Sequence, residues 1–95
     1  PAIAVVKIKN KVGLMDVQGQ LLIPVQYDHI EVYPGLQTHN LVRVRQHGKW
    51  GLMQLQGKWV LPAEYDVIRD AEDGSIEVEK NGKTFHVNTQ GHIVP

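Results

Sequence analysis

An internal repeat constrains the fold of this chain more than any other feature of its sequence. Shifting the sequence by 38 positions against itself superposes a Gly-Leu-Met triplet, a proline and a Tyr-Asp pair on second copies of the same residues. The matching segments are Gly13-Leu14-Met15 with Gly51-Leu52-Met53, Pro24 with Pro62, and Tyr27-Asp28 with Tyr65-Asp66. A further shift of 34 positions places Gly48-Lys49 on Gly82-Lys83 and identifies a third, shorter copy. Repeats of this kind indicate small supersecondary units that bury their apolar side chains against neighbours.

Each copy has the pattern of a β-hairpin. Residues 41–45 alternate apolar and charged side chains, as residues 76–79 do in the third copy, and this alternation is typical of a half-buried strand. Asn81-Gly82 follows the strand of the third copy and favours a type I′ turn, in which both central residues take positive φ. His47-Gly48 and Lys9-Asn10 hold the equivalent positions in the other copies.

A second turn and a third strand complete the copy. Asp16 and Gly19 have the spacing of a type I turn closed by a glycine bulge, and Asn88 and Gly91 repeat it in the third copy. We expect a third strand at 21–23 and at 59–61. A proline follows each of these strands, and since proline has no N–H to donate, we expect it to end the ladder.

These patterns predict an all-β chain, since no segment has a convincing helical period. We expect tandem antiparallel β-hairpin or three-stranded repeats that form an open twisted array, with a partial propeller or a barrel-like sheet as the alternative. A closed propeller has at least about four blades, so this chain is too short to close one alone. We treat residues 1–95 as a single domain, with copies at about 3–38 and 39–74 and a truncated third copy at about 75–95.

The second copy resembles the bacterial WG repeat, also described as a KWG-type repeat. The residues that carry the resemblance are Gly48-Lys49-Trp50-Gly51-Leu52-Met53, Gly57-Lys58, Val60-Leu61-Pro62, Tyr65-Asp66 and Ile68. The first copy has Val12 in place of the tryptophan, and the third has Thr84-Phe85 in place of Trp-Gly. The resemblance implies an all-β tandem array within a larger bacterial protein, with no shared catalytic motif. The departures in the outer copies suggest capping units that face solvent.

Composition excludes several classes of function. Lysine and arginine balance aspartate and glutamate at ten each, so we expect no nucleic-acid partner. Residues 1–49 carry a net charge of +3 and residues 50–95 a net charge of −3, which favours head-to-tail self-association at low salt. No stretch approaches the ~20 apolar residues of a membrane helix, so we expect no membrane insertion. There is no cysteine, and the scattered histidines lack metal-site spacing, so we predict no metal and no cofactor.

The candidate binding residues are aromatic side chains and the two connections between copies. Trp59 is a candidate for exposure because the WG pattern tolerates many residue types there, and Tyr65 lies in the recurrent Tyr-Asp pair. The connection at 33–40 is uncharged and that at 70–74 is acidic, so loops that differ at equivalent positions are candidates for specificity. The predicted surface comprises Trp59, Tyr65, Tyr33, His39, Asp70, Glu72 and Asp73.

Two functions from different classes fit the sequence. The first is a non-enzymatic module that mediates protein–protein interaction, with a protein or peptide as partner, since an open array leaves unpaired edges for strand addition. The alternative is a carbohydrate or cell-wall binding module built on Trp59 and Tyr65. We expect neither an enzyme nor a small-molecule receptor, because the sequence has no nucleophile–base pair, phosphate loop or metal motif.

Overall fold

The computed structural model describes residues 3–32, 40–70 and 74–94, and these residues form β-strands and turns without a helix. The first sheet, sheet A, comprises β1 (Ile3–Ile8), β2 (Lys11–Asp16) and β3 (Leu21–Tyr27). Sheet B comprises β4 (His29–Glu31), β5 (Leu41–Gln46), β6 (Lys49–Gln54) and β7 (Trp59–Tyr65). Sheet C comprises β8 (Val67–Asp70), β9 (Ile76–Lys80) and β10 (Lys83–Val87).

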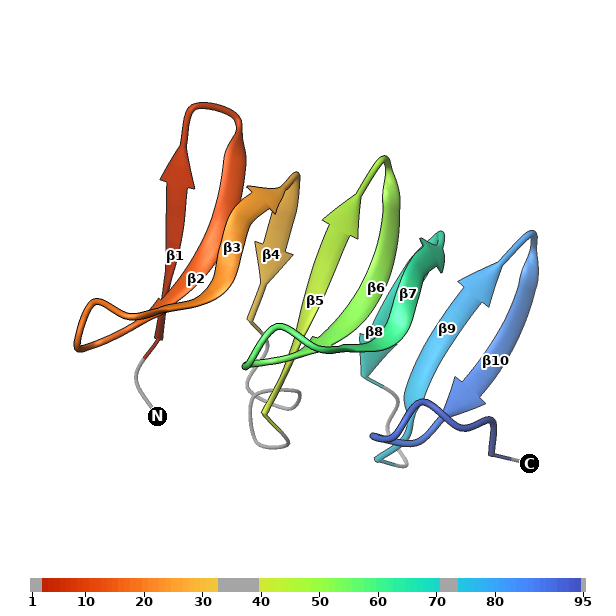
Figure 1. The fold of residues 1–95 in the computed structure, drawn as a ribbon. Helices are drawn as coiled ribbons and strands as arrows, with labels where there is room; N and C mark the ends of the chain where they lie inside the picture. The colour runs from red at the N-terminus through yellow and green to blue at the C-terminus, as the bar shows by residue number, and fades with distance from the viewer. Residues whose placement is uncertain (1–2, 33–39, 71–73, 95) are drawn as a thin grey trace.

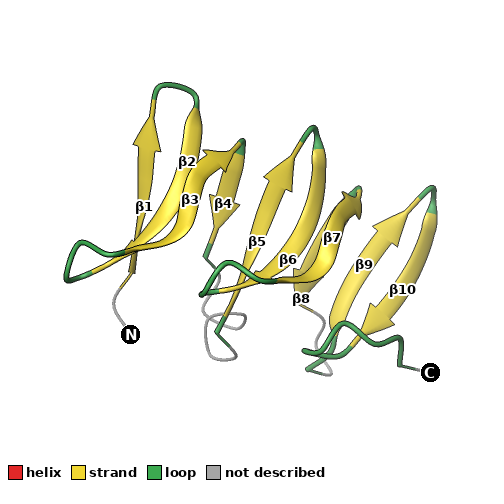
Figure 2. Cartoon of the chain, in the orientation of Figure 1, coloured by secondary structure: helices red, strands yellow, loops and turns green. Residues whose placement is uncertain are grey.

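The three sheets form a row, and the two ends of the chain lie at opposite ends of it (Figure 1). Every strand pair is antiparallel and joins neighbours in sequence, so each sheet is a simple meander. The particle extends 40 Å along the row and 18 Å across its thinnest dimension. The predicted all-β open array is confirmed, and none of the three sheets closes into a barrel (Figure 2).

The Tyr-Asp motif marks the point where the chain leaves one sheet and enters the next. Tyr27 ends β3 in sheet A, and His29 begins β4 in sheet B, with Asp28 between them. Tyr65, Asp66 and β8 repeat this arrangement between sheets B and C. The short strands β4 and β8 add an edge strand to the sheet that follows, and the sequence patterns did not predict them.

Both third strands continue past their prolines, so the prediction that proline ends the ladder was wrong. β2 and β3 pair Leu14 with Ile23 and Val12 with Tyr27, so four steps along β3 oppose two along β2. Pro24 lies in the resulting bulge, where no ladder hydrogen bond needs its missing N–H. An equivalent bulge in β7 of sheet B contains Pro62, between the pairs Leu52–Leu61 and Trp50–Tyr65.

The turns follow the sequence closely. His47 and Gly48 have φ values of 55° and 80°, and Asn81 and Gly82 have 54° and 78°, as a type I′ turn requires. In the second type of turn the Gly19 amide donates to the Asp16 carbonyl oxygen at 3.2 Å. The Asp16 side chain accepts from the amides of Gln18 and Gln20 at 2.9 Å each, which explains the preference for Asp or Asn at this position.

Two hydrophobic clusters join the sheets face to face. The first lies between sheets A and B and contains Leu14, Ile23, Val44 and Met53, all fully buried. The second lies between sheets B and C and contains Leu52, Ile68 and Val78 together with Leu41, Leu61, Ile76 and Val87. Sheet B therefore buries both faces, and the alternation along β6 sends Leu52 towards sheet C and Met53 towards sheet A.

Candidate binding surface

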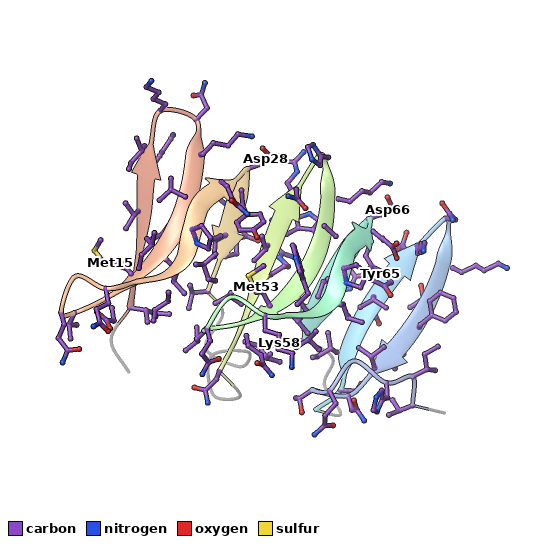
Figure 3. The ribbon with its side chains drawn as sticks, viewed as in Figure 1. Met15, Asp28, Met53, Lys58, Tyr65 and Asp66 are labelled. Carbon is purple, nitrogen blue, oxygen red and sulfur yellow. The ribbon has the colours of Figure 1, made fainter. Side chains whose placement is uncertain are left out.

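The aspartate of each Tyr-Asp motif joins two sheets through hydrogen bonds. Asp28 accepts from the Lys11 ammonium of sheet A at 2.7 Å and from the backbone N–H of His47, in the β5–β6 turn of sheet B, at 2.9 Å. Asp66 repeats the arrangement with the Lys49 ammonium and the Asn81 amide. Asp28 and Asp66 both lie at the end of the sheets where the β5–β6 and β9–β10 turns are (Figure 3). The amide lies in the left-handed turn that the sequence predicts, so the turn aims its N–H at the preceding copy.

These contacts lower the pKa of both aspartates. The side-chain hydrogen bond from Lys11 is the main cause for Asp28, and the His47 amide adds to it. Lys49 and then Asn81 do the same for Asp66. A carboxylate with a depressed folded-state pKa stabilises the fold above its unfolded pKa of about 3.9 and loses that contribution as the pH falls through the folded value.

We therefore expect acid to weaken the contacts between the sheets. The double variant Asp28→Asn, Asp66→Asn should unfold at lower urea concentration than the wild type at about pH 6, because it lacks the stabilised carboxylates. At about pH 3 the two urea midpoints should approach each other, since the wild-type carboxylates are then becoming protonated. A difference in midpoint that stays constant between the two pH values would contradict this role of the aspartates.

The tyrosine of the first motif packs against an aromatic ring of the next sheet. Tyr27 is 5% exposed, and its ring meets that of Trp59 edge to face, with the centroids 5.7 Å apart and the planes at 88°. Trp59 projects from sheet B towards sheet A, beside its cross-strand partner Met53. Trp59 is thus a packing residue at the junction of sheets A and B.

Trp50 lies on the opposite face of sheet B, among charged side chains. The guanidinium carbon of Arg43 lies 4.0 Å from the centre of its ring, and the ring of His29 meets it edge-on at 5.9 Å. Arg43 also pairs with Glu31 and donates to the carbonyl oxygen of Ile68 in sheet C at 2.5 Å. Burial lowers the pKa of the Arg43 guanidinium. Arg43 therefore ties sheet B to sheet C, as Asp66 does.

A hollow of about 300 Å³ lies beside Tyr65, between sheets B and C. Its lining is mainly apolar, with Val78, Phe85, Val87 and Ile93 opposite Tyr65 and the Lys80 ammonium 5.8 Å from the tyrosine ring. The equivalent space between sheets A and B holds the ring of Trp59 against Tyr27. In the third copy Ile93 stands at the position of Trp59 and is 70% exposed, so its smaller side chain leaves the space unfilled.

The two end faces of the row differ in chemistry. The outer face of sheet A, which we call the N-terminal face, carries the side chains of Ala4, Val6, Ile8, Met15 and Leu21, with Lys11 beside Ile8 at its edge. Ile8 and Leu21 are 56% and 52% exposed. On the outer face of sheet C, Arg69 pairs with Glu77 and Glu79, and His86 lies 3.8 Å from Glu77. One end therefore presents apolar side chains and the other presents ion pairs.

The comparison with protein families identifies the repeat. A family model described as the WG containing repeat matches residues 13–50 and 50–83. The chain belongs to the WG repeat family. No curated protein gives a significant match. The solved structures give none either.

Of the predicted binding residues of this WG repeat protein, Trp59, Tyr65 and Asp70 lie in the described part of the chain, and their surroundings differ. Trp59 is half-buried, Tyr65 lines the hollow, and Asp70 is exposed at the end of β8. Tyr33, His39, Glu72 and Asp73 lie outside the described residues. The N-terminal face was missed, although Ala4, Val6, Met15 and Leu21 match Val42, Val44, Met53 and Trp59 in copy two, and this shared apolar pattern could have indicated a stacking surface.

Within the described ranges 3–32, 40–70 and 74–94, no three side chains of the metal-ligating types gather around a common point. The same ranges contain no helix that could cross a membrane. The described residues present an apolar face on sheet A and turn amides that donate hydrogen bonds to carboxylates.

Proposed function

We propose that this WG repeat array is a non-enzymatic module that binds another protein through its N-terminal face. The observation that supports this is the contrast between the two ends. In sheets B and C, the positions equivalent to the N-terminal face are buried against the preceding sheet. They hold Val42, Val44 and Met53 in sheet B, and Ile76, Val78 and Val87 in sheet C. Large exposed apolar faces on soluble proteins are typical of interaction sites.

The polar outer face of sheet C makes the binding directional. On this face of sheet C, His86 holds the position of Leu52, which is buried in sheet B. Glu77 and Glu79 hold the positions of Arg43 and Arg45. A neighbour that stacked on this face would have to desolvate the ion pairs of Arg69, which is costly. We therefore assign binding to the N-terminal face, and pairing of the basic and acidic halves of two copies becomes an outcome to test.

A carbohydrate-binding role has less support. It needs aromatic rings that lie flat and open to solvent, whereas Trp59 packs edge-on with Tyr27 and Trp50 lies beside Arg43. We keep it as an arm of the test: tryptophan fluorescence that changes on addition of cell-wall polysaccharide would favour it over the protein partner.

The proposal predicts which exposed apolar residue matters. Leu21→Glu places a charge on the N-terminal face, and Ile93→Glu makes the same change at the equivalent exposed position of the last copy. Proteins from cells that express the chain would be captured on it, purified and titrated against each variant. We expect affinity for Leu21→Glu to fall at least about tenfold, or 1.4 kcal/mol, and affinity for Ile93→Glu to stay within about twofold. Equal affinities for the two variants would contradict the proposal.

A further inference from the structure

The first sheet has one strand fewer than the second, and the difference lies at the β1 edge. In sheet B, residues 29–31 pair with residues 43–45 of β5. In sheet C, β8 pairs with β9 in the same way. Among the described residues, β1 pairs with β2 alone, and residues 5–7 hold the positions that receive the extra strand in sheet B. The β1 edge therefore offers backbone groups to an incoming strand.

The strands that fill this place in sheets B and C carry the same three anchors. An aromatic ring precedes the strand, as Tyr27 does, and packs against the next sheet. An aspartate then accepts the turn amide of the sheet being entered, at 2.9 Å for Asp28 and 3.3 Å for Asp66. An isoleucine two residues later is buried in the cluster, with Ile30 3% and Ile68 0% exposed. The motif is Tyr-Asp-x-Ile.

Sheet A presents a partner for the aspartate and for the aromatic ring. Lys9 occupies the turn position of His47 and Asn81 and has the same left-handed conformation, with φ of 58° against 55° and 54°. Val6, Ile8, Met15 and Leu21 occupy the positions that line the hollow beside Tyr65 in sheet C. The exposed side chains of Lys7 and Lys9 make this hairpin tip basic, which suits an incoming carboxylate.

We propose that the N-terminal face is a docking site for the Tyr-Asp-x-Ile strand of a further WG repeat, which adds to the β1 edge antiparallel. This inference rests on the proposed function and names its partner. A second copy of this chain is a poor source of the strand, because Asp28 and Asp66 are already bound to Lys11 and Lys49 and to the turns that follow. The occupant is therefore a repeat whose Tyr-Asp strand is unengaged.

Strand addition can be measured directly with a peptide. A synthetic peptide with the sequence of residues 21–32 would be titrated into the isotopically labelled full chain while the Lys9 amide resonance is followed. We expect saturable binding with a shift of the Lys9 signal. Peptides with Asp28→Asn or Tyr27→Ala should bind at least about tenfold more weakly, since each removes a buried anchor or a charged acceptor. Leu21→Glu in the chain should abolish binding, and Ile93→Glu should not affect it.

A covalent version of the experiment removes the cost of association. A copy of residues 21–40, placed ahead of Ile3, supplies the strand with the natural spacing that separates β4 from β5. We expect the melting temperature to rise by about 5 °C. The same extension with Asp28→Asn in the added copy should lose most of that gain.

Each outcome separates this inference from the proposed function. If the peptide does not bind and the extension does not stabilise the chain, or if the Asp28→Asn forms behave like the parent, the strand assignment is wrong. If, in addition, Leu21→Glu still loses its captured partner, the N-terminal face binds a different kind of protein and the proposed function stands. Dimers seen by light scattering that Leu21→Glu dissociates, without peptide binding, would make a second copy the occupant and overturn the inference.

Discussion

Replacing Leu52 by alanine is expected to lower the free energy of unfolding by about 3 kcal/mol. Leu52 is fully buried in the cluster between sheets B and C, beside its cross-strand partner Leu61. The substitution removes three side-chain carbon atoms and leaves a cavity, because the backbones of β6 and β7 are fixed by their ladder and cannot collapse into it. For a domain of this size the loss corresponds to a fall in melting temperature of about 15 °C.

Urea unfolding followed by tryptophan fluorescence measures this effect, since Trp50 and Trp59 both lie in sheet B. Val17→Ala is the matched control, because Val17 is 74% exposed and its truncation should cost less than about 0.5 kcal/mol. A loss below about 1 kcal/mol for Leu52→Ala would mean that sheets B and C are not closely packed in solution.

Gly51→Ala is expected to cost about 3 kcal/mol, although it adds a single methyl group. A Cβ at this position would lie 2.5 Å from a ring carbon of Trp59, 2.7 Å from the carbonyl oxygen of Leu61 and 2.8 Å from the amide nitrogen of Ala63. The last two are backbone atoms of the bulged strand β7, so the strain is relieved only by moving that strand away from β6. Gly13 faces the same restriction under β3, where its Cβ would lie 2.5 Å from the Ile23 carbonyl oxygen.

Gly48→Ala separates this crowding from ordinary glycine strain. Gly48 has φ of 80°, but a Cβ there meets no atom within 4 Å, so the substitution should cost about 1 kcal/mol from backbone strain alone. Chemical unfolding of both variants gives the comparison. Equal losses would show that β7 does not cross Gly51 as closely as described.

The contrast between Gly51 and Phe85 explains why the third copy tolerates an aromatic residue at the same position. Among the described residues, the segment after β10 contacts that strand through the isolated bridge between Val87 and Ile93 and through the Val94 amide, which donates to the His86 carbonyl oxygen at 2.8 Å. No described strand crosses Phe85, so its ring can turn towards sheet B and line the hollow beside Tyr65. The glycine of the WG motif is thus required by the crossing strand and not by the turn that precedes it.

Local signals in the sequence were sufficient for much of the fold. The hairpin turns at His47-Gly48 and Asn81-Gly82 depend on φ preferences that adjacent residues determine, and the Asp16 turn depends on bonds within five residues. The repeat then extended these predictions to the whole chain. An open array of antiparallel sheets follows from the same signals.

The remaining features depend on register and on distant partners. The bulge that accommodates Pro24 is visible only when β3 is paired with β2, so the proline looked like a strand end. Asp28 accepts a hydrogen bond from the amide of a turn 19 residues away in the next sheet, a partner that no local pattern indicates. The role of Trp59 depends on a distant partner in the same way, because its packing is determined by Tyr27 across the junction.

The chain passes from one sheet to the next within each repeat, at the Tyr-Asp motif, and this has a consequence for how the number of copies can change. A matched WG segment begins in β2 and runs through β3 and β4 into β5 and the start of β6, so the duplicated unit straddles two sheets. Residues one period apart hold equivalent positions in successive sheets, so recombination between copies keeps the order of the strand pairs. Arrays of this type can therefore gain or lose whole copies without breaking a strand pair.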